Sequence, residues 1–252
     1  MARTIAVTMR KGGSGKTTTT VNLAAALALR DKRVLLVDLD PQANATVGVG
    51  INPLEVKYHI GELLANPSID PRVAIYRTEY GLNILPSHVQ LAKTESGMKA
   101  TDLYAFRSLL EPLEGEFDYI LVDTPPSESM LTASALTFAS EVIIPLQAHY
   151  FAMEGLAQAM EQVDKVKRGL NKNISVVGIL PTMVNARTNI SRTVIDAARA
   201  AYPNLVYPFV VDYSVRHPEA TLAGVPIVVY DPEHSGAVAY KRLAVVVDNG
   251  QA

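Results

Sequence analysis

Residues 11–18 read Lys11-Gly12-Gly13-Ser14-Gly15-Lys16-Thr17-Thr18, and the rest of the fold can be worked out from this segment. It follows an apolar run, Thr4–Met9, and precedes a helix-forming run, Thr17–Leu29, so it joins an expected strand to an expected helix. Glycines let backbone N–H groups turn inward without a Cβ clash, and the helix adds the positive end of its dipole. The Lys16 ammonium would reach the terminal phosphates of a nucleotide, and the Thr17 hydroxyl would ligate Mg²⁺. The segment therefore predicts a phosphate-binding loop.

This loop departs from the usual consensus at its first position. The pattern G-x-x-x-x-G-K-[ST] requires glycine at position 10, where this chain has Arg10, and a second lysine, Lys11, stands inside the loop. The alternative is a Gly-rich turn that only caps a helix. The place of Gly15-Lys16-Thr17 at a strand–helix junction favours the phosphate loop.

Short apolar runs alternate with helical stretches along the rest of the chain. The apolar runs predict buried strands at Thr4–Met9, Arg33–Val37, Leu82–Leu85, Tyr119–Val122, Val142–Leu146, Ser175–Leu180 and Leu205–Tyr207. Helices are expected at Thr17–Leu29, Tyr104–Leu110, Ser129–Phe138, Met153–Arg168, Ser191–Ala201 and Ala237–Val247. This alternation predicts an α/β fold, in which residues 1–252 form a single domain with a mainly parallel twisted sheet and helices on both faces. The less regular residues 50–100 are interpreted as a surface excursion rather than a second domain.

Carboxylates follow two of the expected strands. Asp38 and Asp40 end one apolar run, and Asp123 ends another. Ligands of parallel sheets bind at the carboxyl ends of the strands, and hard oxygen ligands suit Mg²⁺ and phosphate chemistry. Each Asp alone could be a helix cap or a turn residue, but together with the loop they favour a functional site.

Composition excludes several classes of protein. The 252 residues contain no cysteine, which excludes disulfides, thiolate metal sites and cysteine-ligated iron–sulfur clusters. A net charge of −2 excludes a globally basic nucleic-acid binder but not a local basic patch. No stretch approaches the ~18 apolar residues of a membrane span. The histidines are scattered without metal-ligand spacing, and we expect packing or surface roles for His59, His88, His149, His217 and His234.

Together these motifs resemble the deviant Walker-box ATPases of the ParA/MinD family, most closely the ParA/Soj-type partition ATPases, over essentially the whole chain. The segments that carry the resemblance are Lys11–Thr18, Val37–Thr46, Val122–Ser127, Thr182–Thr188 and Val215–Asp231. The resemblance implies ATP and Mg²⁺ as cofactors, and slow hydrolysis to ADP and phosphate that a partner stimulates.

The resemblance also implies roles for single residues. Lys11 resembles the lysine that reaches the nucleotide of the other subunit in an ATP-sandwich homodimer. Asp38 resembles the acid that positions the attacking water and supports Mg²⁺ through a water, and Asp40 nearby is expected to share that role. The implied catalytic residues are Lys11, Lys16, Asp38 and Asp40, and the implied Mg²⁺ ligands are Thr17, Asp38 and Asp123. The implied nucleotide-binding residues are Lys11, Gly12, Gly13, Ser14, Gly15, Lys16, Thr17, Thr18, Asp123, Asn185, Asp212 and Tyr213.

Some positions depart from the family pattern. Asp212 stands where many relatives have proline, and Asn185 replaces the commoner aspartate. Ala43 replaces the commoner glycine after Pro-Gln. The first of these departures concerns the adenine contacts, and none of them touches the phosphate chemistry.

Family members differ in the surface that they bind. Arg187 and Arg216 resemble arginines that contact DNA in ParA relatives, and basic residues outnumber acids between Glu161 and Arg199. Nonspecific, salt-dependent DNA binding is therefore expected, although ordinary solvated helix faces would show the same charges. A MinD-like membrane-binding ATPase is the alternative, and residues 244–252 hold no lysine or arginine to support it. A P-loop metabolite ligase is a further alternative.

The expected function is thus an ATP-dependent dimerising switch. It binds nucleoid DNA without sequence preference, and it positions or segregates a cargo such as a plasmid, a chromosome or a protein compartment like a carboxysome. A ParB-like or cargo-adaptor protein is expected to stimulate hydrolysis. We expect the protein to be cytoplasmic and nucleoid-associated, with no membrane partner.

Overall fold

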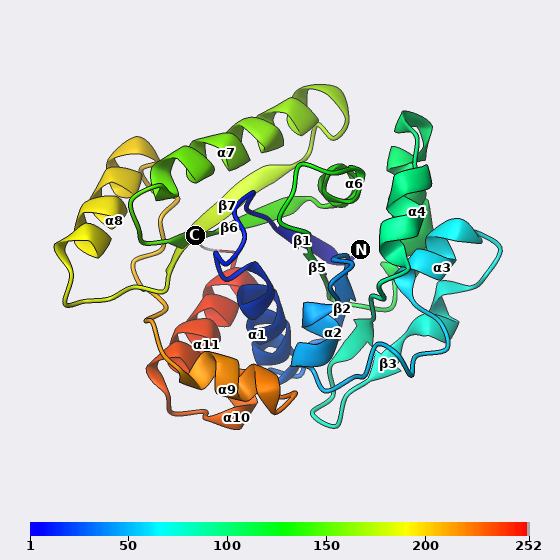
Figure 1. Cartoon of the computed structure of the whole chain (residues 1–252), viewed down its shortest axis with the longest axis horizontal. Helices are drawn as coiled ribbons and strands as arrows, with labels where there is room; N and C mark the ends of the chain where they lie inside the picture. Colours follow the sequence, from blue (N-terminus) through cyan, green and yellow to red (C-terminus); the bar gives the residue numbers. More distant parts are fainter. Residues whose placement is uncertain (251–252) are drawn as a thin grey trace.

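One twisted sheet runs through the middle of the molecule, with helices on both sides (Figure 1), in a computed structural model that describes residues 1–250. The sheet has seven strands in the order β3-β4-β2-β5-β1-β6-β7. Every neighbouring pair is parallel except β3 and β4. The strands are β1 (Arg3–Val7), β2 (Val34–Asp38), β3 (Tyr76–Arg77), β4 (Asn83–Leu85), β5 (Tyr119–Asp123), β6 (Glu141–Gln147) and β7 (Ser175–Thr182). The predicted α/β class with a mainly parallel sheet is confirmed.

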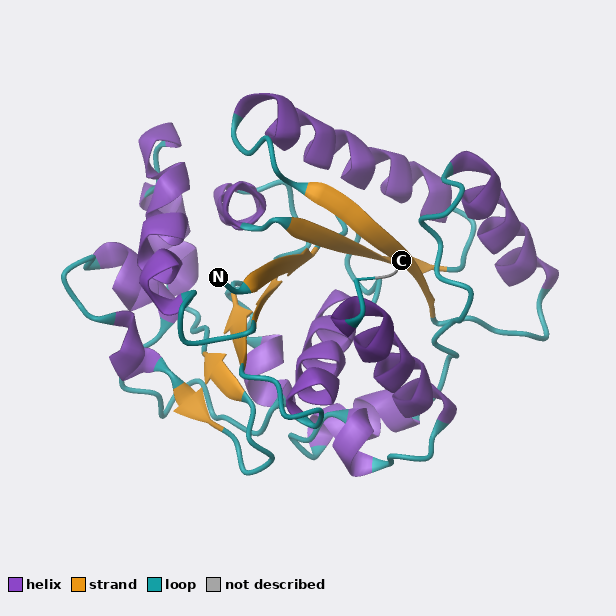
Figure 2. Ribbon diagram, turned by 180° about the vertical axis from the view of Figure 1, so that it is seen from behind, coloured by secondary structure: helices purple, strands orange, loops and turns teal. Residues whose placement is uncertain are grey.

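Strand β1 shows how the sheet is covered on both faces. Successive side chains of a strand point to opposite faces. Ile5 and Val7 enter the apolar cluster formed with α1 (Lys16–Ala28) and α11 (Ser235–Asp248). Ala6 enters the cluster on the other face, against α7 (Ala152–Gly169). Figure 2 shows the sheet from behind, between these two helical layers.

The remaining helices complete the layers. Helix α6 begins at Met130, where the Ser129 hydroxyl accepts a hydrogen bond from Thr132 N and so caps the first turn. The α-helices not yet given are α2 (Asn44–Gly48), α3 (Ile60–Ala65), α4 (Leu91–Gly97), α5 (Ala105–Leu110), α6 (Met130–Phe138), α8 (Asn189–Ala201), α9 (Arg216–Leu222) and α10 (Ile227–Tyr230). Three 3₁₀ helices lie at Pro71–Ala74, Ala100–Tyr104 and Glu111–Leu113.

The strand predicted at Leu205–Tyr207 is wrong. This segment forms only an isolated bridge, between Val206 and Ile179 of β7. Pro203 and Pro208 flank it, and proline cannot donate to a ladder, so the pairing does not extend. The segment is apolar because it is buried and not because it forms a strand. The Tyr207 ring packs directly over Gly178, and a Cβ atom at position 178 would collide with it.

Residues 50–100 do not form a second domain. They contain α3, α4 and the short antiparallel pair β3–β4 at the edge of the sheet. Their apolar side chains, such as Leu63 and Leu91, pack into the same cluster as Val37 of β2 and Val122 of β5. Helices α2, α3 and α4 are too short to give a clear helical periodicity, which is why the sequence did not predict them.

Candidate active site

The phosphate loop connects β1 to α1 at the carboxyl end of the central strands. Gly13 and Gly15 have φ angles of 71° and 85°, in the left-handed region that strains other residues. Gly15 is the N-cap of α1, and no side chain caps the N–H groups of the first turn. These free N–H groups and the helix dipole can therefore hold an anion.

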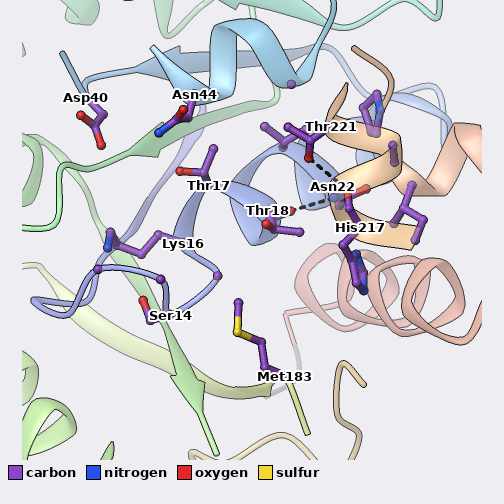
Figure 3. A pocket seen from close by; sticks show the side chains of 18 of the residues that line it. Ser14, Lys16, Thr17, Thr18, Asn22, Asp40, Asn44, Met183, His217 and Thr221 are labelled. Atoms are coloured by element: carbon purple, nitrogen blue, oxygen red, sulfur yellow. Dashed lines mark hydrogen bonds between the residues drawn. The ribbon is translucent and has the colours of Figure 1, made fainter. Parts of the chain in front are cut away.

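Residues Gly12–Thr18 line a cavity of about 310 Å³ (Figure 3). Asp40 and Asn44 border it from the segment after β2, and Pro126 borders it from the segment after β5. The Ser14 hydroxyl is buried and has no hydrogen-bond partner within residues 1–250. A phosphate oxygen would satisfy this hydroxyl, so the loop fits a nucleotide.

Lys16 extends its side chain across the loop. The side chain is buried, and its Nζ donates a hydrogen bond to the Lys11 carbonyl at 3.1 Å. Burial lowers the pKa of Lys16, and the carboxylates of Asp123 and Asp40 oppose that shift. A phosphate group beside this ammonium would favour its charged form in the same way.

Two acids lie opposite each other on β2 and β5. The sheet register pairs Asp38 with Asp123, and both side chains are fully buried. Thr17 Oγ1 donates to Asp123 Oδ2 at 2.7 Å, and Thr20 Oγ1 donates to Oδ1 at 3.0 Å. Burial raises the pKa of Asp123, and the negative charge of Asp38 raises it further. A divalent cation would offset this cost.

The oxygens at Thr17 and Asp123 suit Mg²⁺, which prefers hard oxygen ligands. Within the described residues, no three His, Asp or Glu side chains come close enough to form a metal site by themselves. Mg²⁺ in nucleotide sites is commonly held by one or two protein groups together with substrate phosphates and waters. The donor set therefore fits Mg²⁺ bound jointly with a nucleotide.

Asp38 and Asp40 occupy different positions. Asp38 Oδ1 accepts a hydrogen bond from Asp40 N at 3.1 Å. Its Oδ2 accepts from Thr46 N at 2.8 Å and from Thr46 Oγ1 at 2.7 Å. Asp38 is absent from the cavity lining, whereas Asp40 lies on it (Figure 3). Asp40 can thus face a bound nucleotide, and Asp38 holds the segment that carries Asp40.

A second cavity of about 610 Å³ continues from the first. The two share Gly15, Thr18, Met183, His217 and Thr221. Met183, His217 and Thr221 lie on the side of the site away from Asp40 (Figure 3). Asp212 and Tyr213 line the second cavity, together with Val211 and Tyr240. With phosphates at the loop, this cavity could accept a base.

Asn185 is not brought to either cavity. Its side chain is exposed, and its Oδ1 accepts a hydrogen bond from Arg187 N at 3.0 Å. Its carbonyl accepts from Thr188 N, also at 3.0 Å. Asn185 therefore shapes the turn before α8 and lies apart from the other residues of the expected nucleotide site.

Lys11 differs from the rest of the phosphate loop. Residues Gly12–Thr18 all line the 310 Å³ cavity, but Lys11 does not. Its ammonium instead contacts Nε2 of His149, in the segment between β6 and α7. The neighbouring Arg10 forms an ion pair with Glu128 at 3.1 Å. Lys11 is thus directed away from the nucleotide cavity of its own chain.

The two arginines expected to contact DNA follow two segments that run side by side. Val184 and Asp212 form a parallel bridge, and Tyr213 N donates to Val184 O at 3.0 Å. Arg187 and Arg216 follow shortly after these bridged residues. Arg187 is exposed and has no ion pair among residues 1–250, whereas Arg216 pairs with Glu219 at 3.1 Å and Asp231 at 3.6 Å.

Basic side chains also lie on α7, on α8 and on the loops beside them. Two of them form ion pairs within their helix, Lys165 with Glu161 at 3.0 Å and Arg199 with Asp196 at 3.8 Å. The exposed basic residues without an ion pair in the described part of the chain include Lys167, Lys172, Arg187 and Arg192. These charges remain available for phosphates.

Sequence reasoning missed several residues of the site. Met183 lies in the segment Thr182–Thr188, and His217 and Thr221 lie in Val215–Asp231. Both segments carried the family resemblance, but these three residues were not predicted to line the site. His217 was expected to have a packing or surface role, and the structure places it between the two cavities. Nothing local to His149 indicated its contact with Lys11, because 138 residues separate the two.

No helix within residues 1–250 combines the length and the apolar character that a membrane crossing requires.

Comparisons with known proteins agree with this geometry. A family model described as an AAA domain matches residues 2–176. The sporulation initiation inhibitor protein Soj of Bacillus subtilis (strain 168) is 41% identical over 97% of this chain and 97% of its own length. A crystal structure of cobyrinic acid a,c-diamide synthase from Mycobacterium smegmatis, with a bound ATP analogue and magnesium, has a TM-score of 0.86 and 33% identity over 98% of this chain and 94% of that one. The septum site-determining protein MinD of Pyrococcus horikoshii OT3, complexed with Mg-ADP, has a TM-score of 0.82 and 27% identity over 98% and 96% of the two chains.

Proposed function

The chain belongs to the ParA/MinD family of ATPases, and from this premise we propose that it is an ATP-dependent dimerising switch that binds DNA without sequence preference and positions a cargo. One observation carries the proposal. Gly12–Thr18 form a complete phosphate cavity, while Lys11 points out of it. A lysine so placed is suited to serve the nucleotide of a second copy.

The hydrolytic step uses residues of the first cavity and the two acids at the ends of β2 and β5. Backbone N–H groups of the loop, the Ser14 hydroxyl and the buried Lys16 ammonium hold the phosphates. Thr17 and Asp123 would hold Mg²⁺, which would supply positive charge to the phosphates. Asp40 orients the attacking water, and Asp38 positions the segment that carries Asp40. No second substrate is needed for this chemistry.

Lys11 of one subunit adds a positive charge beside the phosphates that the other subunit holds. A cation supplied in trans to the transferring phosphoryl group stabilises the charge that develops there, as an arginine finger does. Because each nucleotide would then contact both chains, ATP holds the homodimer together. Hydrolysis removes the bridging phosphate and lets the subunits separate, so the nucleotide sets the assembly state.

DNA binding is assigned to the basic surface of α7, α8 and the loops with Arg187 and Arg216. Each subunit offers only a few unpaired charges, so binding becomes useful when a dimer doubles them. Contacts to phosphates alone carry no sequence information, so this binding is expected to be nonspecific. The ATP-bound protein would therefore gather on the nucleoid.

The cargo is a plasmid, a chromosome or a protein compartment such as a carboxysome, and a ParB-like or cargo-adaptor protein stimulates hydrolysis. The similarity to the chromosome partitioning protein ParA of Myxococcus xanthus (strain DK1622), which is 40% identical over 96% of this chain, favours a partition role. A partner that accelerates hydrolysis at the cargo would remove the dimer from nearby DNA, and the resulting gradient would move the cargo.

The experiment is binding to a random DNA duplex with ATP, with ADP and without nucleotide, over a salt series. We expect binding with ATP only, and a linear fall of log affinity with log salt concentration. Binding that does not depend on the nucleotide would contradict the switch. Binding to anionic vesicles without DNA binding would favour a MinD-like role, and turnover of a second, carboxylate-bearing metabolite would favour a ligase.

Charge reversal locates the DNA surface. Arg187→Glu should weaken DNA binding about tenfold and reduce the salt slope by about one, while ATP affinity stays unchanged. Arg216→Glu should lose DNA binding similarly, and unchanged DNA affinity would remove Arg216 from the surface. Arg77→Glu is the matched control, because Arg77 is exposed on β3 at the opposite edge of the sheet from β7.

A further inference from the structure

His149 holds the Lys11 side chain within a single subunit. The Lys11 ammonium contacts His149 Nε2, although Lys11 lies in the phosphate loop and His149 lies between β6 and α7. The histidine is half-buried and fixed by its own backbone: Nδ1 accepts a hydrogen bond from Phe151 N at 3.1 Å, and His149 N donates to Gln147 O at 2.8 Å. The ring is therefore oriented before Lys11 arrives.

The His149 ring has only one acceptor nitrogen for two donors. A neutral imidazole has one acceptor nitrogen and one N–H donor. The Phe151 N–H and the Lys11 ammonium are both donors, and they approach the two ring nitrogens of His149. The ring can accept fully from only one of them. The Lys11 contact consequently competes with a local backbone bond and is easily replaced by a stronger acceptor.

A nucleotide phosphate is such an acceptor. A charge-assisted bond from an ammonium to a phosphate is roughly twice as strong as a bond between neutral groups. In a single chain Lys11 contacts His149 and is not among the residues that line the phosphate cavity, so its ammonium does not face a phosphate bound there. A second chain carrying ATP would supply one.

We propose that His149 is a positioning residue for Lys11: it retains the Lys11 ammonium in the separate subunit and releases it to the nucleotide of the partner when the dimer forms. This inference rests on the trans role of Lys11 in the proposed function. His149 itself touches neither nucleotide nor water in the reaction. Its effect is to make assembly less favourable until a nucleotide on the partner subunit replaces the contact.

The first test measures the reactivity of the Lys11 amine in the nucleotide-free, full-length protein. An amine-acetylating reagent is applied in limiting amount, and mass spectrometry gives the labelling rate of Lys11 relative to the exposed Lys93. His149→Leu and His149→Ala should raise the Lys11 rate about fivefold, the ratio expected for losing one hydrogen bond of ordinary net strength. His149→Gln keeps an acceptor oxygen and should restore the wild-type rate.

A matched control separates this contact from a local structural effect. His88 forms the same bond to its own backbone, with Nδ1 accepting from Gln90 N at 3.2 Å, but no lysine contacts its other nitrogen. His88→Leu should leave Lys11 labelling unchanged. If His149→Leu and His149→Ala change Lys11 labelling no more than His88→Leu does, the inference is wrong.

The second test measures the dimer dissociation constant with ATP by sedimentation. Each subunit releases one lysine, so His149→Leu should lower the constant by about 25-fold, the square of the single-site factor, while ATP affinity of the monomer stays unchanged. An unchanged or higher constant overturns the inference. Failure of the proposed function gives a different result: Lys11→Ala would then dimerise with ATP as well as the wild type does.

Discussion

The phosphate end and the base end of the nucleotide site are built in different ways. The phosphate end comes from one loop and two strand ends, and its groups are buried and linked by hydrogen bonds such as Thr17 to Asp123 at 2.7 Å. The base end is assembled from segments that lie far apart in sequence and meet only in the fold, at Met183, Asp212, His217 and Tyr240. Under the proposed function we therefore expect affinity and chemistry to depend on the first end, and base discrimination on the second.

This difference shows what each end can tolerate. A change at the phosphate end removes a charge or leaves a buried polar group without a partner, and either effect is costly. A change at the base end removes apolar contact from an open cavity, which costs less. Inorganic triphosphate can separate the two ends experimentally, because it occupies only the first.

The largest effect is expected from Lys16→Ala. The buried ammonium faces the phosphate cavity, and hydrogen bonds to charged groups are the strongest of their kind. ATP affinity should fall by at least about 100-fold, and triphosphate affinity should fall with it. Calorimetric titration measures both. Equal thermal stability of the variant and the wild type would show that the loss is not unfolding, and retained triphosphate binding would contradict the assignment.

Asp40→Ala should lower the hydrolysis rate about 100-fold without loss of ATP binding, because Asp40 lines the cavity and no other group replaces its carboxylate. The ATP dimer should accumulate, as measured by sedimentation.

Asp38→Ala should also reduce hydrolysis and trap the ATP form. It should in addition lower the free energy of unfolding by about 2 kcal/mol, because both donors of Thr46 lose their acceptor. If Asp40→Ala hydrolysed ATP at the normal rate, Asp38 alone would be the acid that positions the attacking water.

At the base end, Met183→Ala should weaken ATP binding by about tenfold through lost apolar contact. Triphosphate affinity should change much less, since Met183 lies where the two cavities join, on the side of the site away from Asp40 (Figure 3). Leu222→Ala is the control, because Leu222 lines the same cavity but is 91% exposed and should lose little. A parallel loss of triphosphate binding in Met183→Ala would mean that the two ends are not independent.

The smallest effect concerns stability and pH in the absence of Mg²⁺ and nucleotide. Burial raises the pKa of Asp38 to about 6 and that of Asp123 to about 8. The folded state therefore binds more protons than the unfolded state in this range, and its stability should rise as the pH falls from about 8 to about 6. In EDTA, the melting temperature should be about 3 °C higher at pH 6 than at pH 8.

Asp123→Asn should remove most of this rise. Asp118→Asn should not, because hydrogen bonds from Arg33 lower the pKa of Asp118 below this pH range. Burial lowers the pKa of His59 and of His217, which acts in the opposite direction at lower pH, so each variant is compared with the wild type over the same series. A melting temperature that falls from pH 8 to pH 6 in the wild type, and equally in Asp123→Asn, would contradict the account of the buried acids.

The same comparison explains what the sequence could predict. Gly13, Gly15 and Lys16 act through their local backbone, and the strands that carry Asp38 and Asp123 are buried apolar runs, so the phosphate end was predictable. The base end depends on tertiary contacts. The bridge of Val184 to Asp212 brings Tyr213 to the site but leaves Asn185 outside it, and no local pattern distinguishes these two outcomes.

Long-range contacts limited the prediction elsewhere too. The apolar segment Leu205–Tyr207 resembles a strand, but Pro203 and Pro208 restrict it to one bridge. The contact of Lys11 with His149 joins two loops that lie 138 positions apart in the sequence, and neither residue type predicts it. The sequence indicated the chemistry of Lys11 and not where its side chain rests.

The most direct test of the switch is to mix two inactive variants. Lys11→Ala keeps a complete phosphate cavity but cannot supply the trans lysine, and Lys16→Ala supplies Lys11 but cannot hold ATP. If Lys11 acts across the dimer, each variant alone hydrolyses no ATP, and an equimolar mixture recovers a measurable fraction of the wild-type rate with DNA present. A mixture as inactive as its components would show that Lys11 serves its own chain and would contradict the account.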